Sequence, residues 1–76
     1  MAQFKFIPRN ENDKAVLDAL RSRNGVHDWV PLSQEDLARE ANRPLSAVQR
    51  ATIRLEEMGV IERRRVYVYQ YRILCD

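Results

Sequence analysis

The side chains of this sequence best suited to recognition chemistry are arginines, and they gather in its second half. From residue 39 onward every basic side chain is an arginine. Residues 1–38 hold five basic and six acidic side chains, a net charge of −1, whereas the remainder holds eight and five, a net charge of +3. Because the planar guanidinium fork matches the oxygens of phosphate and the edge of guanine, this half of the chain predicts nucleic-acid binding.

The residue types that carry catalysis or bind metals are scarce. The chain has one cysteine, Cys75, and one histidine, His27, which are too few for a tetrahedral metal site within one chain. It also lacks a recognisable pair of catalytic carboxylates, a glycine-rich phosphate loop or a cluster of metal ligands. We therefore expect a binding protein that is not an enzyme and has no metal and no cofactor.

Length and composition predict one small folded domain. The chain has 76 residues, of which 45% are apolar and 32% charged, as in ordinary globular proteins. Its apolar runs, such as residues 66–69, are far shorter than the roughly 20 residues of a membrane-spanning helix, and no secretory signal is recognisable. We expect a cytoplasmic protein, associated with the nucleoid or located in a host cytoplasm, with no membrane partner.

The first half of the sequence predicts an N-terminal arm over residues 1–9 and a helix over residues 11–23. Asn10 is a suitable N-cap, and the acidic residues Glu11 and Asp13 favour the positive end of the helix dipole. Asn24 and Gly25 provide a left-handed stop. A short strand at Trp29 and Val30 follows, with Trp29 expected as a core anchor under a sheet.

Two further helices are predicted over residues 34–41 and 45–58, joined by a tight turn. Ser33 is the expected N-cap of the first, and Pro44 or Ser46 begins the second. Gly59 ends the second helix. Its apolar face is expected to consist of Val48, Ala51, Thr52, Leu55 and Met58.

The last segment, residues 60–74, is rich in β-branched and aromatic residues and predicts a β-hairpin. The run Arg63–Arg65 is the expected hairpin tip, and an unbroken strand pairing with another chain is the alternative. Tyr67, Tyr69 and Tyr71 alternate along the strand, which indicates sheet core or a dimer surface in preference to a stacking platform for single-stranded nucleic acid.

Together these elements predict an α+β fold in which a three-helix bundle carries a small antiparallel β-hairpin. Two short helices joined by a tight turn form a helix-turn-helix, whose second helix enters the major groove of DNA. A hairpin directly after that helix extends the motif to a winged helix-turn-helix, with the hairpin as the wing.

The segment LAREANRPLSAVQRATIRLEEMGVIERRR, residues 37–65, resembles the core of winged-helix transcription regulators of the MarR and GntR kind. Their pattern is L-A-x-x-x-x-x-S-x-x-T-V-x-R-x-x-x-x-L-E-x-x-G-L-I. The matching residues are Leu37, Ala38, Val48, Arg50, Leu55, Glu56, Gly59, Val60 and Ile61.

The chain departs from this pattern at Pro44, where the family often has a capping serine, and at Ala47, where it often has threonine or serine. Its wing is shorter than a MarR wing, and the extra helices through which MarR proteins dimerise are absent from this sequence. The resemblance is equally close to minimal winged-helix regulators of plasmids, phages and archaeal viruses.

The residues expected to contact DNA come from the second helix of the motif and from the wing. Ser46, Gln49 and Arg50 are expected to reach base edges, since glutamine can pair with adenine and arginine with guanine. Arg54 is expected either to clamp a phosphate or to pair with Glu57. The complete set is Arg43, Ser46, Gln49, Arg50, Arg54, Arg63, Arg64 and Arg65.

We therefore expect a sequence-specific regulator of transcription, a repressor or an activator, that binds double-stranded DNA as a homodimer. Phe4 to Ile7 and Ile73–Leu74 are the candidate dimer surfaces. Ile53, an apolar residue on a polar helix face, is expected to touch a thymine methyl group or a partner chain. Two alternatives remain: a recombination or replication accessory factor that binds DNA, and a winged helix that binds another protein and not DNA.

Overall fold

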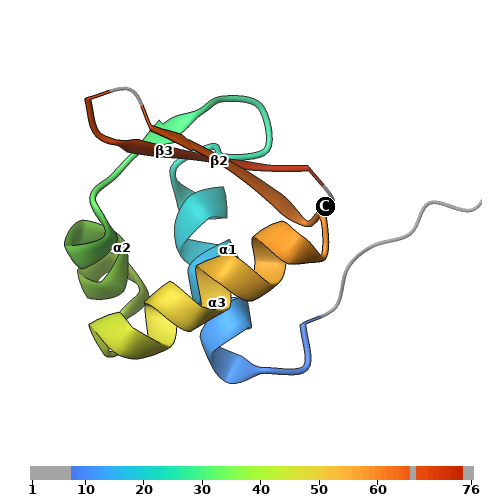
Figure 1. Ribbon diagram of the computed structural model, residues 1–76, viewed down its shortest axis with the longest axis vertical. Coiled ribbons are helices and arrows are strands. Elements are labelled where there is room, and N and C mark those ends of the chain that lie inside the picture. Colours follow the sequence, from blue (N-terminus) through green and yellow to red (C-terminus); the bar gives the residue numbers. More distant parts are fainter. Residues whose placement is uncertain (1–7, 66, 75–76) are drawn as a thin grey trace, which may run out of the picture.

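Three helices and one antiparallel sheet of three strands make up the α+β fold of the computed structural model, which describes residues 8–65 and 67–74 (Figure 1). The predicted N-terminal arm lies almost entirely outside these residues. The elements in chain order are α1 (Glu11–Ser22), β1 (Val30–Pro31), α2 (Gln34–Ala41), α3 (Leu45–Glu57), β2 (Ile61–Arg65) and β3 (Tyr69–Ile73).

Two of the three helices begin where a side chain accepts a hydrogen bond from a free backbone amide. The Asn10 side chain accepts a hydrogen bond from the Asn12 amide at 2.8 Å, and the Ser33 hydroxyl accepts one from the Asp36 amide at 3.1 Å. Pro44 precedes α3 and provides no side-chain cap. The first turn of α3 therefore has free backbone amides at the surface.

All three helices end in a residue with left-handed backbone: Asn24 has φ 64°, Asn42 has φ 56° and Gly59 has φ 74°. At the end of α1 the left-handed residue is Asn24, and Gly25 has a different role. Its amide donates to the Leu20 carbonyl at 2.8 Å, and a Cβ on Gly25 would lie 2.8 Å from that same oxygen. Glycine is required there because the chain passes so close to the helix end.

The strands follow the order β1-β3-β2, and every pair is antiparallel. Ile61 pairs with Ile73, and the pairing continues to Arg65 opposite Tyr69. The prediction that Arg63–Arg65 form the hairpin tip is therefore wrong, because all three lie within β2. Consecutive arginines are tolerated here because β2 is an edge strand, where charged side chains can reach water and discourage pairing with another chain. The turn to β3 lies beyond Arg65 and includes Tyr67 and Val68.

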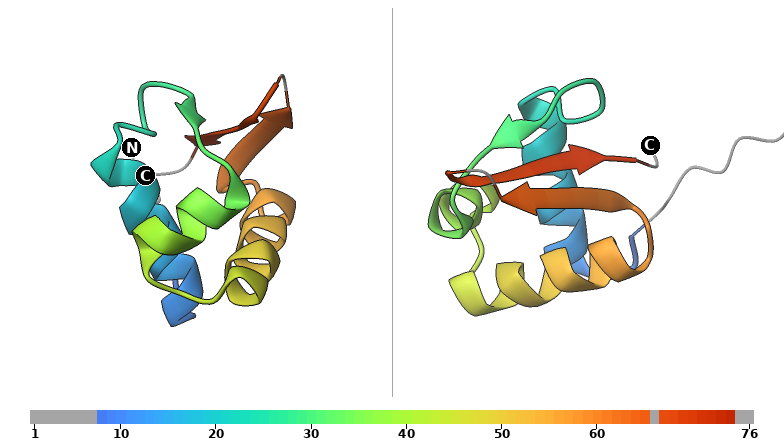
Figure 2. Two further views of the ribbon diagram at one scale, coloured as in Figure 1. Left: turned by 90° about the vertical axis from the view of Figure 1, so that its left-hand side faces the viewer. Right: turned by 45° about the horizontal axis from the view of Figure 1, so that its top comes forward.

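The core lies between the helices and one face of the sheet, and all three helices lie on that side (Figure 2). Its largest fully buried side chains are Val16, Leu17, Leu20, Leu37, Val48, Thr52, Leu55, Ile61 and Tyr71. Met58, expected on the buried face of α3, is 53% exposed because it follows the last helical residue. Among the described residues, no helix has the length and apolar composition needed to cross a membrane.

Candidate nucleic-acid interface

The outward face of α3 carries the side chains that the sequence assigned to base contacts. Val48, Ala51, Thr52 and Leu55 face the core, so helical periodicity turns Ser46, Arg50, Ile53 and Glu57 to the surface. Within the described part of the chain, Arg50 has no ion pair and no hydrogen bond through its side chain. Its guanidinium is therefore available to a ligand.

Gln49 lies at the side of this face, where α3 approaches the start of α2. Its amide nitrogen donates to the side-chain oxygen of Gln34 at 3.1 Å. The residue is exposed, and this hydrogen bond restricts its orientation at the surface. Gln49 can therefore present a partly ordered amide to a ligand on α3.

Arg54 has a structural partner that the sequence did not reveal. Its Nη2 lies 2.5 Å from Oδ1 of Asp13, and its Nε lies 3.3 Å from Oδ2. The Asp13 side chain is only 7% exposed, and the pairing raises the pKa of Arg54 above its ordinary value. Arg54 therefore neutralises a buried carboxylate and joins α3 to α1, and the expected pairing with Glu57 is wrong.

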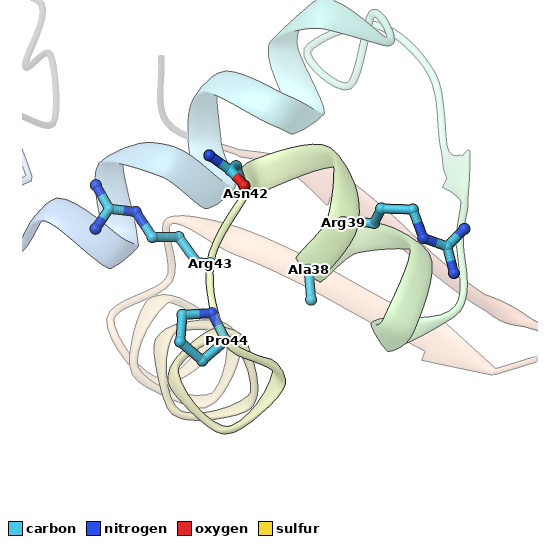
Figure 3. Close-up of a pocket in the computed structure, with 5 residues that line it drawn as sticks. All are labelled: Ala38, Arg39, Asn42, Arg43 and Pro44. Carbon is cyan, nitrogen blue, oxygen red and sulfur yellow. The ribbon is translucent and has the colours of Figure 1, made fainter.

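Arg43 lies in the turn between α2 and α3, beside a shallow hollow lined by Ala38, Arg39, Asn42, Arg43 and Pro44 (Figure 3). Its Nη2 approaches Glu11 only to 3.7 Å, whereas Arg39 pairs with Asp36 at 3.0 Å. Figure 3 shows the guanidiniums of Arg39 and Arg43 pointing in different directions, away from the hollow. The hollow therefore has no converging pair of cations to bind an anion.

The three consecutive arginines of β2 differ in their surroundings. Arg63 Nη2 pairs with Glu56 at 3.1 Å and so ties the sheet to α3. Arg64 Nε donates to the side-chain oxygen of Gln70 at 2.6 Å, and Arg65 lies 5.6 Å from the centre of the Tyr69 ring. Among the described residues, neither Arg64 nor Arg65 has a carboxylate partner, so both keep an uncompensated positive charge.

Trp29 is not the core anchor that the sequence predicted. It is half-buried, and the guanidinium carbons of Arg64 and Arg72 lie 4.1 Å and 4.6 Å from the centre of its ring. Val30, the next residue, faces the core, so strand alternation turns Trp29 to the opposite side of the sheet. Cation–π contacts of this kind contribute about 0.5–1 kcal/mol each at exposed sites.

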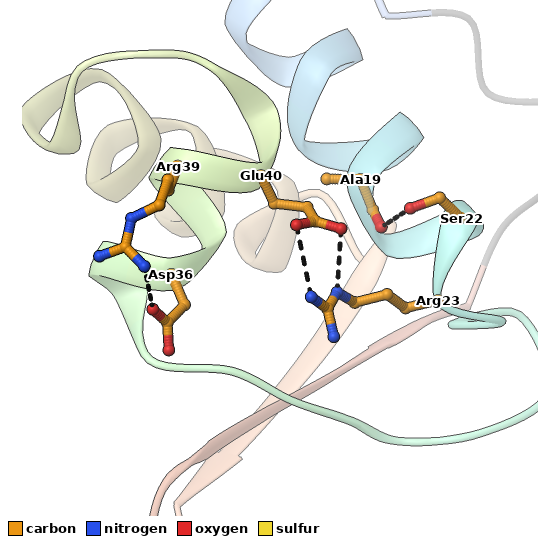
Figure 4. Close-up of polar contacts among 6 residues, drawn as sticks. All are labelled: Ala19, Ser22, Arg23, Asp36, Arg39 and Glu40. Carbon is orange, nitrogen blue, oxygen red and sulfur yellow. Dashed lines mark hydrogen bonds and ion pairs between the residues drawn. The ribbon is translucent and has the colours of Figure 1, made fainter.

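Most other arginines of the described chain are paired within the molecule. Arg23 holds Glu40 through two contacts, Nε at 3.1 Å and Nη2 at 3.3 Å, and thereby links the end of α1 to α2 (Figure 4). The carboxylate pairs in the described chain are Arg21–Asp18, Arg23–Glu40, Arg39–Asp36, Arg43–Glu11, Arg54–Asp13, Arg63–Glu56 and Arg72–Glu62.

The described arginines without a carboxylate partner are Arg9, Arg50, Arg64 and Arg65. Three of them come from α3 and β2. The left view of Figure 2 places α3 and the β2–β3 hairpin on the same side of the molecule, on the side away from α1. The uncompensated positive charge of the fold is therefore concentrated on these two neighbouring elements.

The tyrosines that alternate in the sequence occupy three different environments. Tyr71 is fully buried, Tyr69 is half-buried and Tyr67, in the hairpin turn, is 99% exposed. They therefore do not form one stacking surface. Ile73, part of an expected dimer surface, is 3% exposed and belongs to the core, whereas its neighbour Leu74 is 49% exposed.

The Tyr71 hydroxyl is buried and has no hydrogen-bond partner among the described residues. Burial raises the pKa of Tyr71, because the charged phenolate would lose its hydration. The Gln34 side chain offsets part of this rise without the geometry of a hydrogen bond. Tyr71 is therefore a structural residue of the sheet.

No protein-family model, no curated protein and no solved structure matches the chain. The described residues contain no group of histidine, cysteine, aspartate and glutamate side chains that would hold a metal ion. The chemistry of the described side chains is therefore what points to a function.

Proposed function

We propose that this protein is a winged helix-turn-helix that binds double-stranded DNA and regulates transcription. The observation that carries the proposal is the distribution of uncompensated charge: Arg50 on α3 and Arg64 and Arg65 on β2 have no carboxylate partner among the described residues. DNA supplies a regular array of phosphates, so cations left unpaired on two adjacent elements suit this ligand.

The arrangement of elements supports the winged-helix assignment. Helices α2 and α3 are joined by the short turn at Asn42–Pro44, and a β-hairpin follows α3 after one turn. The hairpin pairs with the short strand β1 between α1 and α2, in the order β1-β3-β2. This is the order of elements expected of a helix-turn-helix extended by a wing.

In this proposal α3 enters the major groove and the hairpin contacts the DNA backbone beside it. Ser46, Gln49 and Arg50 contact base edges, and Ile53, which is 46% exposed, packs against a thymine methyl group. Arg64 and Arg65 bind phosphates. Arg43, whose contact with Glu11 is long, exchanges that carboxylate for a phosphate when DNA is bound.

Arg54 and Arg63 have a structural role in this proposal, whereas the sequence suggested that they contact DNA. Each already pairs with a carboxylate that joins two elements, Arg54 with Asp13 and Arg63 with Glu56. In the proposed complex they hold α3 against α1 and against the sheet. They thereby fix the angle at which α3 is presented to the groove.

The test is DNA binding by the purified protein, measured by fluorescence anisotropy of a labelled mixed-sequence duplex over a range of salt concentrations. We expect affinity to fall steeply with salt, with a log-log slope of about −3 or steeper, because at least three phosphates are neutralised. Arg50→Ala is expected to cost about 1–3 kcal/mol on a selected site and to relax base preference at one position.

Arg23→Gln is the matched control, because it removes one positive charge from an arginine that is already paired with Glu40. We expect this variant to bind like the wild type. Absence of binding at low salt, or equal losses in Arg23→Gln and Arg50→Ala, would reject the proposed interface.

A second candidate function is protein binding through the same face of α3. Two apolar side chains are exposed there, Ile53 at 46% and Leu45 at 37%. If the protein fails to bind DNA at low salt, Ile53→Asp becomes the diagnostic variant. Loss of a partner captured by the wild-type protein, with the fold retained, would support this alternative.

A further inference from the structure

The outer face of the sheet, opposite the helices, carries an ordered group of side chains that the fold does not use. Tyr71 points into the core. In the register of the strands it lies opposite Val30 of β1 on one side and opposite Arg63 of β2 on the other. Because strand side chains alternate, Trp29, Arg64 and Arg72 all project from the opposite face. We call these three residues the Trp29 cluster.

Two cation–π contacts, one hydrogen bond and one ion pair order the side chains of the Trp29 cluster. One indole ring carries two guanidiniums, with the Arg64 carbon 4.1 Å and the Arg72 carbon 4.6 Å from the ring centre. Arg64 Nε also donates to Gln70, and Arg72 Nη2 pairs with Glu62. Both arginines are therefore ordered before any ligand arrives, which lowers the entropy lost on binding.

The charge of the Trp29 cluster is not balanced by its neighbours. Glu62 is the one carboxylate paired with it in the described chain, so two guanidiniums share one negative charge. The Arg72 Nε is buried without a hydrogen-bond partner among the described residues. That nitrogen is enclosed by the protein and out of reach of a ligand. The two guanidiniums held on one ring nevertheless repel each other, and a bound anion would relieve this repulsion.

The chemistry of the missing ligand follows from the free donors. The Nη groups of Arg64 make no hydrogen bond with the described residues, and the guanidinium lies over the indole ring of Trp29. A planar guanidinium fork of this kind binds two oxygens of a phosphate. Arg65, the next residue, projects from the other face of the sheet, beside Tyr69, and is not part of the Trp29 cluster.

We propose that the Trp29 cluster is a phosphodiester-binding site, in which Arg64 and Arg72 contact the DNA backbone and Trp29 is the positioning residue that holds them. This inference rests on the proposed function, and it adds Trp29 and Arg72 to the interface. Trp29 itself touches no DNA, and it acts by keeping the two guanidiniums ordered.

The first experiment compares the salt dependence of DNA binding in single variants. Arg64→Gln is expected to reduce the log-log slope by about one, because it removes one phosphate contact. Arg72→Gln is expected to reduce it by less, because Arg72 shares its charge between the phosphate and Glu62. Trp29→Leu keeps both charges, so we expect the slope to stay unchanged while affinity at physiological salt falls about threefold to tenfold. Trp29→Phe keeps an aromatic face and is expected to recover most of the loss.

The second experiment uses fluorescence, because Trp29 is the only tryptophan in the chain. Binding of the duplex is expected to shift its emission as phosphate approaches the guanidiniums on the ring. We expect no shift in the double variant Arg64→Gln, Arg72→Gln. Circular dichroism checks that each variant is folded. If Trp29→Leu unfolds, the DNA affinity of Trp29→Phe is measured in its place.

The outcomes separate this inference from the proposed function. If the wild type binds DNA and Arg50→Ala weakens binding, but Arg64→Gln and Arg72→Gln leave the slope unchanged, the Trp29 cluster is a structural feature and the inference is wrong. If the wild type binds no DNA, both proposals fail. Arg23→Gln again serves as the charge-matched control and is expected to leave slope and emission unchanged.

Discussion

Asp13 shows how the surroundings of one residue decide the role of another. Its carboxylate is buried on the inner side of α1 and accepts two hydrogen bonds from Arg54. A buried charge without a partner costs several kcal/mol, whereas an exposed arginine costs little to redirect. Arg54 is therefore committed to Asp13, while Arg50, one turn earlier in α3, stays available to a ligand.

We predict that Arg54→Met destabilises the protein by about 1–3 kcal/mol, less than the roughly 3–5 kcal/mol typical of a fully buried pair, because Arg54 is itself partly exposed. Urea unfolding measures the change. Asp13→Asn combined with Arg54→Met is expected to recover part of the loss, since the unpaired charge is then gone. DNA affinity is expected to fall modestly, because Arg54 fixes the angle of α3 without contacting DNA; a large loss of affinity without loss of stability would assign Arg54 to phosphate binding.

A second prediction at this scale concerns Tyr71, whose pKa is raised by burial. The folded state holds the hydroxyl proton of Tyr71 more tightly than the unfolded state does. The free energy of unfolding that this difference contributes is therefore complete below the unfolded pKa of about 10 and is lost as pH rises above it. We expect stability to fall at alkaline pH, and the fall to be smaller in Tyr71→Phe. Unfolding experiments at pH 8 and at about pH 10.5 test this; equal falls in both proteins would contradict it.

The limits of the helices are determined by residues at their ends, whose preferred backbone conformation or capping side chain suits a helix start or stop. Each helix is followed by a residue with positive φ, and two of the three helices begin with a side-chain cap. Gly25 and Gly59 lie beyond α1 and α3 for different reasons. Gly59 has φ 74° in open space, whereas Gly25 lies against the Leu20 carbonyl.

This difference predicts unequal costs for the same substitution. Gly59→Ala is expected to cost about 1–2 kcal/mol, the strain of a left-handed alanine with nothing for its methyl group to meet. Gly25→Ala is expected to cost more, at least about 2 kcal/mol, because the methyl group collides with a backbone oxygen and breaks the hydrogen bond to Leu20. Thermal unfolding of the two variants gives the order, and a reversed order would contradict this account of the α1 end.

Considered as a whole molecule, the fold has two exposed faces with different chemistry. The side formed by α3 and the hairpin carries unpaired arginines, and the side formed by α1 and α2 carries arginines paired with carboxylates. The longer of the two edge strands is β2, with three consecutive arginines. Pairing of two copies through this edge would bring like charges together, so a homodimer is expected to form elsewhere.

At this scale we predict that two copies bind a two-fold symmetric site, with half-sites about one helical turn of DNA apart. Sedimentation of the protein with a selected duplex measures the stoichiometry. Leu74, exposed beside the C-terminal end of β3, is the testable surface residue. Leu74→Asp is expected to leave the fold intact and to reduce cooperative binding; one copy per duplex at saturation would exclude the dimer.

Local signals in the sequence were sufficient to predict the three helices and their caps. The predicted second helix coincides with α2, and the first and third agree with α1 and α3 to within one residue. The stop signals at Asn24, Asn42 and Gly59 act within a few residues, so they are readable without knowledge of the fold. The buried face of α3 followed from helical periodicity, apart from Met58 at its end.

The sequence alone did not determine which arginines are free to bind a ligand or on which face of the sheet Trp29 lies. Asp13 and Arg54 are far apart in the chain, and Trp29 meets Arg64 and Arg72 only through the order β1-β3-β2. The position of the hairpin turn likewise depended on the pairing of Ile61 with Ile73, which no turn residue announces. Burial and strand register are properties of the assembled chain, and here they decide which charges stay uncompensated at its surface.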